Sequence, residues 1–85
     1  MTPQFAPGVR LHHDTARARW VVLAPERMIV PDEIALEVLR LVDGARTEDA
    51  IIDALAEKFA APRAEISADV GDLLDDLAAK GLLLR

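Results

Sequence analysis

The chain has 85 residues, no cysteine and a formal net charge of −5. This length suits one small domain, and without cysteine there are no disulfides and no zinc–thiolate site. No apolar run approaches the roughly 20 residues that span a bilayer, and the first residues do not have the pattern of a signal peptide. We therefore expect a cytoplasmic protein that does not enter a membrane.

The charge is divided unevenly along the chain. Residues 1–31 carry four basic and two acidic side chains, which gives +2, whereas residues 32–85 carry six basic and thirteen acidic side chains, which gives −7. The acidic segment of residues 32–85 repels polyanions. This argues against nucleic acid and against an anionic membrane surface as partners.

The first part of the chain predicts three short strands behind an N-terminal arm. Residues 1–8 contain proline and glycine without periodicity, and we expect a flexible arm there. Alternating or β-branched runs over residues 9–13, 18–24 and 27–30 predict an antiparallel sheet, with Pro25 separating the last two strands. So small a sheet has free edges, and a free edge can accept a strand from another chain.

The rest of the chain predicts three helices and therefore an α+β fold. The first begins near Pro31 and ends at Asp43-Gly44, the second is capped by Thr47, and the third runs from residues 62–67 to Lys80. An extended apolar tail follows at residues 82–84, which we expect to pack under the sheet. Apolar positions at helical spacing predict the core faces: Ile34, Val38 and Leu41 beside Ala35, Leu39 and Val42; Ile51, Ile52, Leu55, Ala56 and Phe59; Ile66, Val70, Leu73 and Leu77.

The sequence offers no convincing catalytic or metal-binding group. His12 and His13 are neighbours on a predicted strand, so they point to opposite faces and do not share one ion. Trp20 is more typical of a core residue than of a binding platform. An acidic cluster on the third helix is typical of a solvated face: Asp69, Asp72, Asp75 and Asp76. We expect no enzyme activity, no cofactor and no metal.

A glycine in the middle of the third helix is more informative. Gly71 costs roughly 1 kcal/mol relative to alanine at such a position. On a helical wheel it belongs to a narrow stripe of mostly small residues, together with Ser67, Leu74 and Ala78. This stripe lies between the core face and Asp75. Two interpretations stay open. The stripe is a groove for a ligand beside the last strand, or it reflects simple tolerance or close packing of another helix.

Four stretches, in order and covering nearly the whole chain, resemble the PqqD family of pyrroloquinoline quinone biosynthesis: Pro7-Gly8-Val9-Arg10-Leu11, Trp20-Val21-Val22-Leu23-Ala24-Pro25-Glu26-Arg27, Asp43-Gly44-Ala45-Arg46-Thr47, and Asp69-Val70 followed by Leu73-Leu74. The resemblance implies a winged-helix-like domain over residues 9–85, with a three-stranded sheet followed by three helices. It also implies a peptide chaperone that is not itself an enzyme. Such a protein binds the precursor peptide PqqA and presents it to the radical S-adenosylmethionine enzyme PqqE.

The same resemblance implies where the peptide binds. In related recognition modules the peptide adds as a strand to the third strand and rests against the third helix. Transferred to this sequence, the expected peptide-binding residues are Arg27, Met28, Ile29, Val30, Ser67, Gly71, Leu74, Asp75 and Ala78.

The sequence supports two other functions less well, and it leaves two oligomeric states open. Helices over 44–61 and 62–80 can be read as the helix-turn-helix of a DNA-binding domain, but the third helix would then present its aspartates to phosphates. Catalysis is the third function considered, after peptide binding and DNA binding. We expect a monomer as the working form, with some tendency to form a strand-swapped homodimer through the free edge and the hinge at Pro25.

Overall fold

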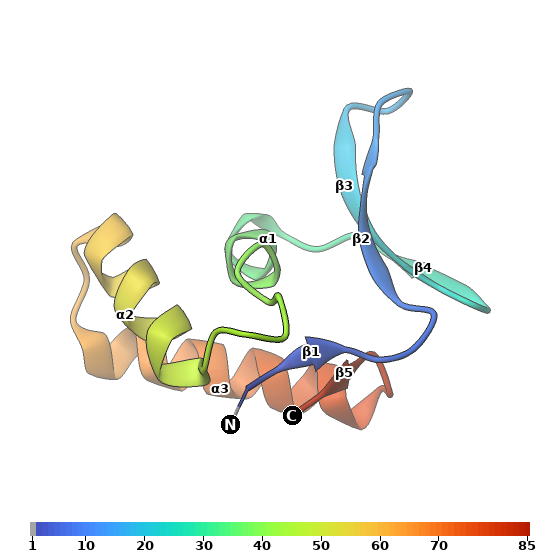
Figure 1. Cartoon of the computed structure of the whole chain (residues 1–85). Coiled ribbons are helices and arrows are strands. Elements are labelled where there is room, and N and C mark those ends of the chain that lie inside the picture. Colours follow the sequence, from blue (N-terminus) through green and yellow to red (C-terminus); the bar gives the residue numbers. More distant parts are fainter. Residues whose placement is uncertain (1) are drawn as a thin grey trace.

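The computed structural model describes residues 2–85; Met1, at the start of the predicted arm, lies outside them. A three-stranded antiparallel sheet precedes three helices, as the sequence predicts, and two further short strands lie at the chain ends (Figure 1). The elements in order are β1 (Gln4–Phe5), β2 (Arg10–Asp14), β3 (Arg19–Ala24), β4 (Arg27–Ile29), α1 (Glu33–Leu39), α2 (Glu48–Phe59), α3 (Arg63–Ala79) and β5 (Leu83–Leu84).

The three-stranded sheet has the order β2-β3-β4, so β2 and β4 are its edges. The central strand supplies Val21 and Val22, both almost fully buried. β3 and β4 are joined by the two residues Pro25 and Glu26, and Ala24 pairs with Arg27 across this loop. In Figure 1 the β2–β3 hairpin projects away from the helices, which leaves the edges of the sheet uncovered over much of their length.

The predicted N-terminal arm contains a short strand that pairs with the end of the chain. β1 pairs antiparallel with β5, with Gln4 opposite Leu84 and Phe5 opposite Leu83. Pro3 is fully buried and Phe5 packs against the core. The pairing satisfies backbone groups of the C-terminal strand. The apolar tail is therefore extended, as predicted, but it pairs with β1 rather than packing under the larger sheet.

The helix boundaries follow local capping. Asp32 caps α1 by accepting a hydrogen bond from the Ala35 amide at 2.7 Å, and Thr47 caps α2 through the Ala50 amide at 3.1 Å. α1 ends at Leu39, several residues before the predicted stop. The next residues form a tighter turn, in which the amides of Leu41 and Val42 donate hydrogen bonds to carbonyls three residues earlier. α2 ends where Ala60 adopts a left-handed conformation with φ of 50°.

The core forms where β3, the three helices and β5 meet, and it corrects three predictions about helix faces. Ile34 and Phe59 are exposed rather than buried, whereas Leu73 is half-buried and packs against the core as predicted. Leu74, predicted to lie in the stripe beside Gly71, is fully buried because the face of α3 that packs inward is rotated toward it. The buried cluster consists of Val22, Val38, Leu39, Val42, Ile51, Ile52, Leu55, Val70, Leu74, Leu77, Leu82 and Leu83.

No helix within residues 2–85 combines the length and apolar character needed to cross a membrane.

Candidate functional site

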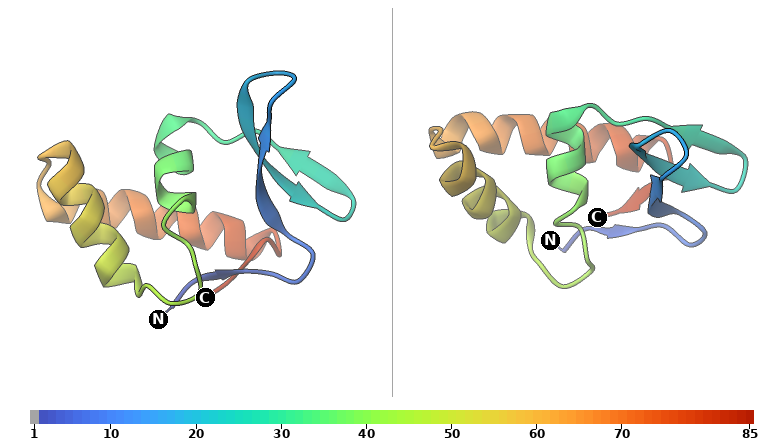
Figure 2. Two further views of the ribbon diagram at one scale, coloured as in Figure 1. Left: turned by 45° about the horizontal axis from the view of Figure 1, so that its top comes forward. Right: turned by 90° about the horizontal axis from the view of Figure 1, so that it is seen from above.

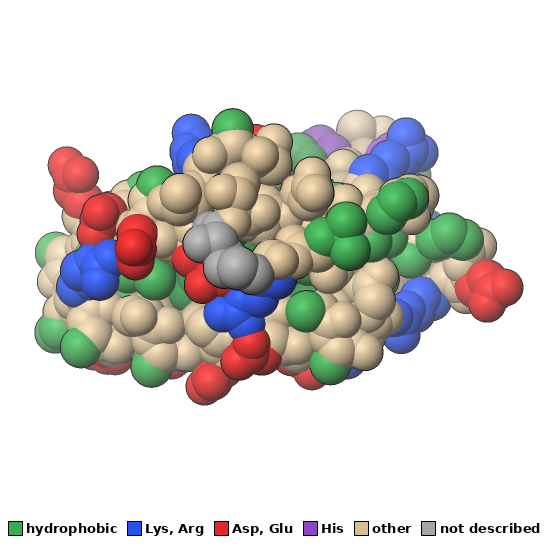
Figure 3. All heavy atoms as spheres, turned by 60° about the horizontal axis from the view of Figure 1, so that its bottom comes forward, with side chains coloured by type: hydrophobic (Ala, Val, Ile, Leu, Met, Phe, Trp, Pro, Cys, Tyr) green, Lys and Arg blue, Asp and Glu red, His purple; other side chains and the backbone are tan. Residues whose placement is uncertain are grey.

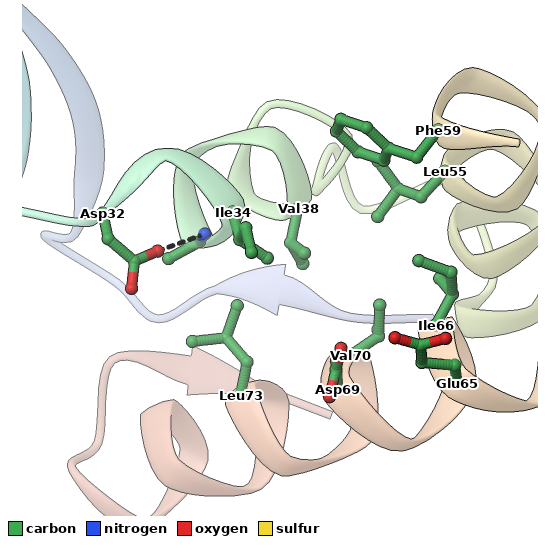
Figure 4. Close-up of a pocket in the computed structure, with 11 residues that line it drawn as sticks. Asp32, Ile34, Val38, Leu55, Phe59, Glu65, Ile66, Asp69, Val70 and Leu73 are labelled. Carbon is green, nitrogen blue, oxygen red and sulfur yellow. Dashed lines mark hydrogen bonds between the residues drawn. The ribbon is translucent and has the colours of Figure 1, made fainter. Parts of the chain in front are cut away.

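One pocket gathers the apolar side chains that the core leaves uncovered. It has a volume of about 520 Å³ and lies between α1, α2 and α3 (Figure 4). Ile34 of α1 is 64% exposed and Phe59 of α2 is 48% exposed. Both line the pocket together with the half-buried Leu73 of α3. Three positions whose spacing predicts core residues thus form the walls of one surface pocket.

The local sequence explains why these side chains stay uncovered. Ile34 lies in the first turn of α1, and Phe59 is the last residue of α2 before the left-handed Ala60. At a helix end the neighbouring helix covers less of each side chain than it does in the middle. Figure 4 shows Leu73 below Ile34 on one side, with Phe59 on the opposite wall.

The floor and the rim of the pocket differ in chemistry. The floor consists of the buried core side chains Val38, Leu55 and Val70. The rim carries three carboxylates, Asp32 at the start of α1 and the pair Glu65 and Asp69 on α3. An apolar interior with a few polar groups at its edge is typical of a ligand pocket.

Strand β4 comes shortly before the first pocket residue in the sequence. Met28 is 49% exposed and Val30 is 52% exposed, and Val30 is followed two residues later by Asp32 of the rim. The Arg27 guanidinium donates a hydrogen bond to the Lys80 carbonyl and so holds the start of β4 against the end of α3. In the right view of Figure 2, β4 and α3 lie along one side of the molecule, with β1 and β5 on the other.

The backbone of Met28 faces outward from the sheet. In an antiparallel pair, residues alternate between those that hydrogen-bond to the neighbouring strand and those that do not. Ala24 and Arg27 close the two-residue loop, which makes them a hydrogen-bonded pair. The next residue, Met28, therefore directs its N–H and C=O to the free edge. These two groups are available to another strand.

The predicted residues of α3 do not line this pocket. Ile66, Asp69 and Leu73 occupy the flank of α3 that faces it. The opposite flank, across the buried stripe of α3, holds Ser67, Gly71, Asp75 and Ala78. Leu74 is 0% exposed and lies in the core, so its placement as a surface contact was wrong.

Two further facts describe that opposite flank. A Cβ at Gly71 would meet no atom within 4 Å outside its own helix, so no neighbouring helix packs closely on it. Asp75 forms an ion pair with Arg85 at the end of the chain. The predicted α3 flank therefore lies away from the pocket, whereas β4 leads along the chain to Asp32 at the pocket rim.

The basic groups near the pocket are engaged with carboxylates that do not line it. Lys58 binds Glu37, and this hydrogen bond lowers the pKa of the Glu37 carboxyl. The Lys58 ammonium also lies 5.7 Å from the centre of the Phe59 ring. Figure 3, seen from below, likewise shows basic side chains lying beside acidic ones on another face. Residues 2–85 contain no cluster of three or more histidine, cysteine or acidic side chains suited to a metal ion.

Outside the pocket, one aromatic group is neither fully core nor fully exposed. Trp20 on β3 is half-buried and stacks on His13, with 4.6 Å between ring centres. Arg40 lies over the same ring at 4.9 Å. The stack joins the hairpin to the end of α1.

Comparison with known proteins identifies relatives over almost the whole chain. The family model described as coenzyme PQQ synthesis protein D (PqqD) matches residues 19–83. A protein of Rhodopseudomonas palustris strain TIE-1 named PqqA binding protein is 61% identical over 95% of this chain and 79% of its own length.

Two solved structures share the fold at substantial identity. One is the PqqD truncation of Methylobacterium extorquens PqqCD, described as a functional, stand-alone recognition element for ribosomally synthesised and post-translationally modified peptides. It is 42% identical, with a TM-score of 0.80, over 98% of this chain and 88% of that one. The other, PqqD from Xanthomonas campestris, is 47% identical with a TM-score of 0.65, over 93% of this chain and 87% of that one. The name PqqA binding protein and the description as a recognition element are those of binding proteins, in agreement with the expectation that the chain is not an enzyme.

Proposed function

Because the chain belongs to the PqqD family of coenzyme PQQ synthesis proteins, we propose that it binds the precursor peptide PqqA. The observation that carries this proposal is the surface formed by the free β4 edge and the neighbouring pocket. Exposed large apolar side chains in so small a domain indicate a surface that another molecule covers. Ile34 and Met28 are the main examples, one in the pocket and one on the edge.

The peptide adds as a strand to β4, so that its backbone pairs with the outward N–H and C=O of Met28. We retain Arg27, Met28, Ile29 and Val30 as contacts of this strand. A strand of three residues offers only a few hydrogen bonds, each worth a net of about 0.5–1.5 kcal/mol. Micromolar affinity requires roughly 8 kcal/mol. Hydrogen bonds therefore supply part of the affinity, and side chains must supply the rest.

The pocket supplies that remaining part. Burying one large apolar side chain contributes about 1.5–3 kcal/mol, so one or two such peptide residues close the gap. On this basis the helix contacts are Ile34, Phe59, Ile66 and Leu73. They replace the flank of Ser67, Gly71, Asp75 and Ala78 in our proposal.

Binding along one short edge leaves the rest of a longer peptide free in solution. We infer that the free part is presented to PqqE, since the chain itself brings no catalytic group to the peptide. This step predicts that PqqE captures PqqA more tightly when the peptide is already bound to this chain. Sedimentation velocity with PqqE and labelled PqqA, in the absence and presence of this chain, measures how much peptide PqqE captures. Equal capture in both cases would contradict presentation.

Calorimetry tests the binding itself and the part played by the pocket. We expect micromolar affinity for PqqA and none for duplex DNA at low salt, because the helical part of the chain is acidic. Ile34→Ser should weaken PqqA binding by about tenfold, since it removes an apolar wall of the pocket. Leu84→Ser is the control, because Leu84 is also exposed but lies on β5. Binding of DNA and not of PqqA would overturn the proposal.

A further inference from the structure

The pocket rim holds carboxylates that lack a cation. Of the fifteen acidic side chains in the chain, eight form ion pairs within the described residues: Asp14, Glu37, Asp43, Glu48, Asp49, Asp53, Asp75 and Asp76. Of the other seven, three line this one pocket: Asp32, Glu65 and Asp69. The negative charge of the protein is therefore neutralised at many places but not at the mouth of the pocket.

The nearby cations are committed elsewhere. Arg63, which precedes Glu65 by two residues, binds Asp53 at 2.6 Å and Asp49 at 3.2 Å on α2. Lys58 binds Glu37. Within residues 2–85 no arginine or lysine lines the pocket. A ligand therefore meets an apolar interior with three carboxylates at its rim that form no ion pair within residues 2–85.

The three carboxylates stand on two sides of that interior. In Figure 4, Asp32 lies at the α1 side, whereas Asp69 and Glu65 lie along α3. One oxygen of Asp32 accepts the capping hydrogen bond from Ala35, which holds this carboxylate in place. Glu65 and Asp69 are four residues apart on one helix and so lie on the same face.

From this arrangement we infer, on the premise of the proposed function, that the pocket selects a peptide segment in which a lysine or arginine stands close to a large apolar side chain. The apolar side chain fills the space between Ile34 and Leu73, and the cation reaches the rim at Asp69 and Glu65. Long basic side chains suit this position because their methylene groups cover apolar surface while the charge stays in water. An acidic segment is rejected by the same carboxylates.

A pair of aspartates on α3 provides a matched test. Asp69 lines the pocket, whereas Asp72 is exposed on the same helix, does not line the pocket, and forms no ion pair within residues 2–85. Asp69→Asn and Asp72→Asn remove the same charge. We expect Asp69→Asn to weaken PqqA binding about three- to fivefold, the effect of one exposed ion pair, and Asp72→Asn to change it less than twofold.

The peptide side completes the experiment without relying on the folding of a variant. PqqA peptides in which each lysine or arginine is replaced by glutamine are titrated against the parent and against Asp69→Asn. One replacement should weaken binding to the parent about as much as Asp69→Asn does, and the two changes together should add little further. Circular dichroism confirms that both protein variants are folded.

The outcomes separate this inference from the proposed function. If the parent binds PqqA but Asp69→Asn and Asp72→Asn weaken binding equally, attraction is due to net charge and the inference is wrong. If no lysine or arginine of the peptide matters, it is wrong as well, while peptide binding stands. If the parent does not bind PqqA at all, the proposed function fails and the inference falls with it.

Discussion

Arg85, the last residue of the chain, joins three parts of the molecule. Its guanidinium donates to both oxygens of Glu48 at the start of α2, with 3.1 Å between Nη2 and Oε2, and it also pairs with Asp75 of α3. The Arg85 and Glu48 side chains are both largely buried, at 25% and 21% exposure. This ion pair is therefore better shielded from water than the pairs of Arg63, and it secures β5 against two helices.

This arrangement predicts a dependence of stability on pH. The hydrogen bond from Arg85 lowers the pKa of Glu48 below its ordinary value of 4.5. A carboxyl with a lowered pKa in the folded state stabilises the fold above that ordinary value, and the stabilisation is lost as the pH falls through the lowered pKa. Arg85→Gln should reduce the free energy of unfolding by about 1 kcal/mol at pH 7 and by much less at about pH 3.

Urea denaturation of the parent and the variant at both pH values measures this difference. Other carboxyls also have lowered pKa values, for example Asp43, which accepts hydrogen bonds from the amides of Arg46 and Ala45. They are unchanged in Arg85→Gln and cancel in the comparison. An equal loss of stability at pH 7 and pH 3 would mean that Arg85 acts through packing rather than through charge.

At the scale of elements, the sheet has two free edges with different surroundings. β4 leads along the chain to the pocket and is held to the end of α3, whereas β2 belongs to the hairpin that projects from the body (Figure 1). Alternation across β3 directs the backbone of Met28 outward on one edge and that of His13 outward on the other. Both edges offer similar hydrogen-bonding groups, but only β4 is followed along the chain by residues of the apolar pocket.

Proline substitutions distinguish the two edges. Met28→Pro removes an outward N–H that the peptide strand requires, so we expect PqqA affinity to fall about tenfold or more. His13→Pro removes an outward N–H from the opposite edge and should leave PqqA binding unchanged. Backbone amide shifts during titration follow the binding site directly. If His13→Pro abolished binding and Met28→Pro did not, the peptide would add to β2 instead.

At the scale of the whole molecule, the same free edge connects peptide binding with self-association. A short strand with exposed Met28 and Val30 can pair with a second copy as well as with a peptide. The strand-swapped homodimer expected from the hinge at Pro25 is one form of such pairing. A bound peptide would compete with it, because both use the outward groups of β4.

We therefore expect a monomer at micromolar concentration, weak dimers near millimolar concentration, and fewer dimers when PqqA is added. Sedimentation velocity over this range, with and without the peptide, measures the distribution. Duplex DNA at the same concentration is the control and should have no effect. A monomer throughout the range would contradict self-association, and dimers that persist with saturating peptide would place the contact elsewhere.

Much of the fold could be predicted from the sequence because it depends on local chemistry. The strands and helices follow from side-chain alternation, from proline and glycine positions and from the caps at Asp32 and Thr47. The resemblance to the PqqD family also led to the correct fold and to β4 as the expected edge. These signals lie within a few residues of one another along the chain, so no knowledge of distant contacts is needed.

Spacing correctly predicted most buried residues of the helices, but only the tertiary structure decided where each buried face ends. Spacing placed Ile34 and Phe59 on core faces and Leu74 on a flank, but the packing of the three helices reversed these assignments. Neighbouring residues on a helix point about 100° apart. A core face that is predicted one position away from the true one therefore exchanges buried and exposed side chains. The pairing of residues 4–5 with 83–84 is likewise a contact across the whole length of the chain. Local patterns along the sequence contain no record of such a contact, because burial depends on what the rest of the chain brings to each side chain.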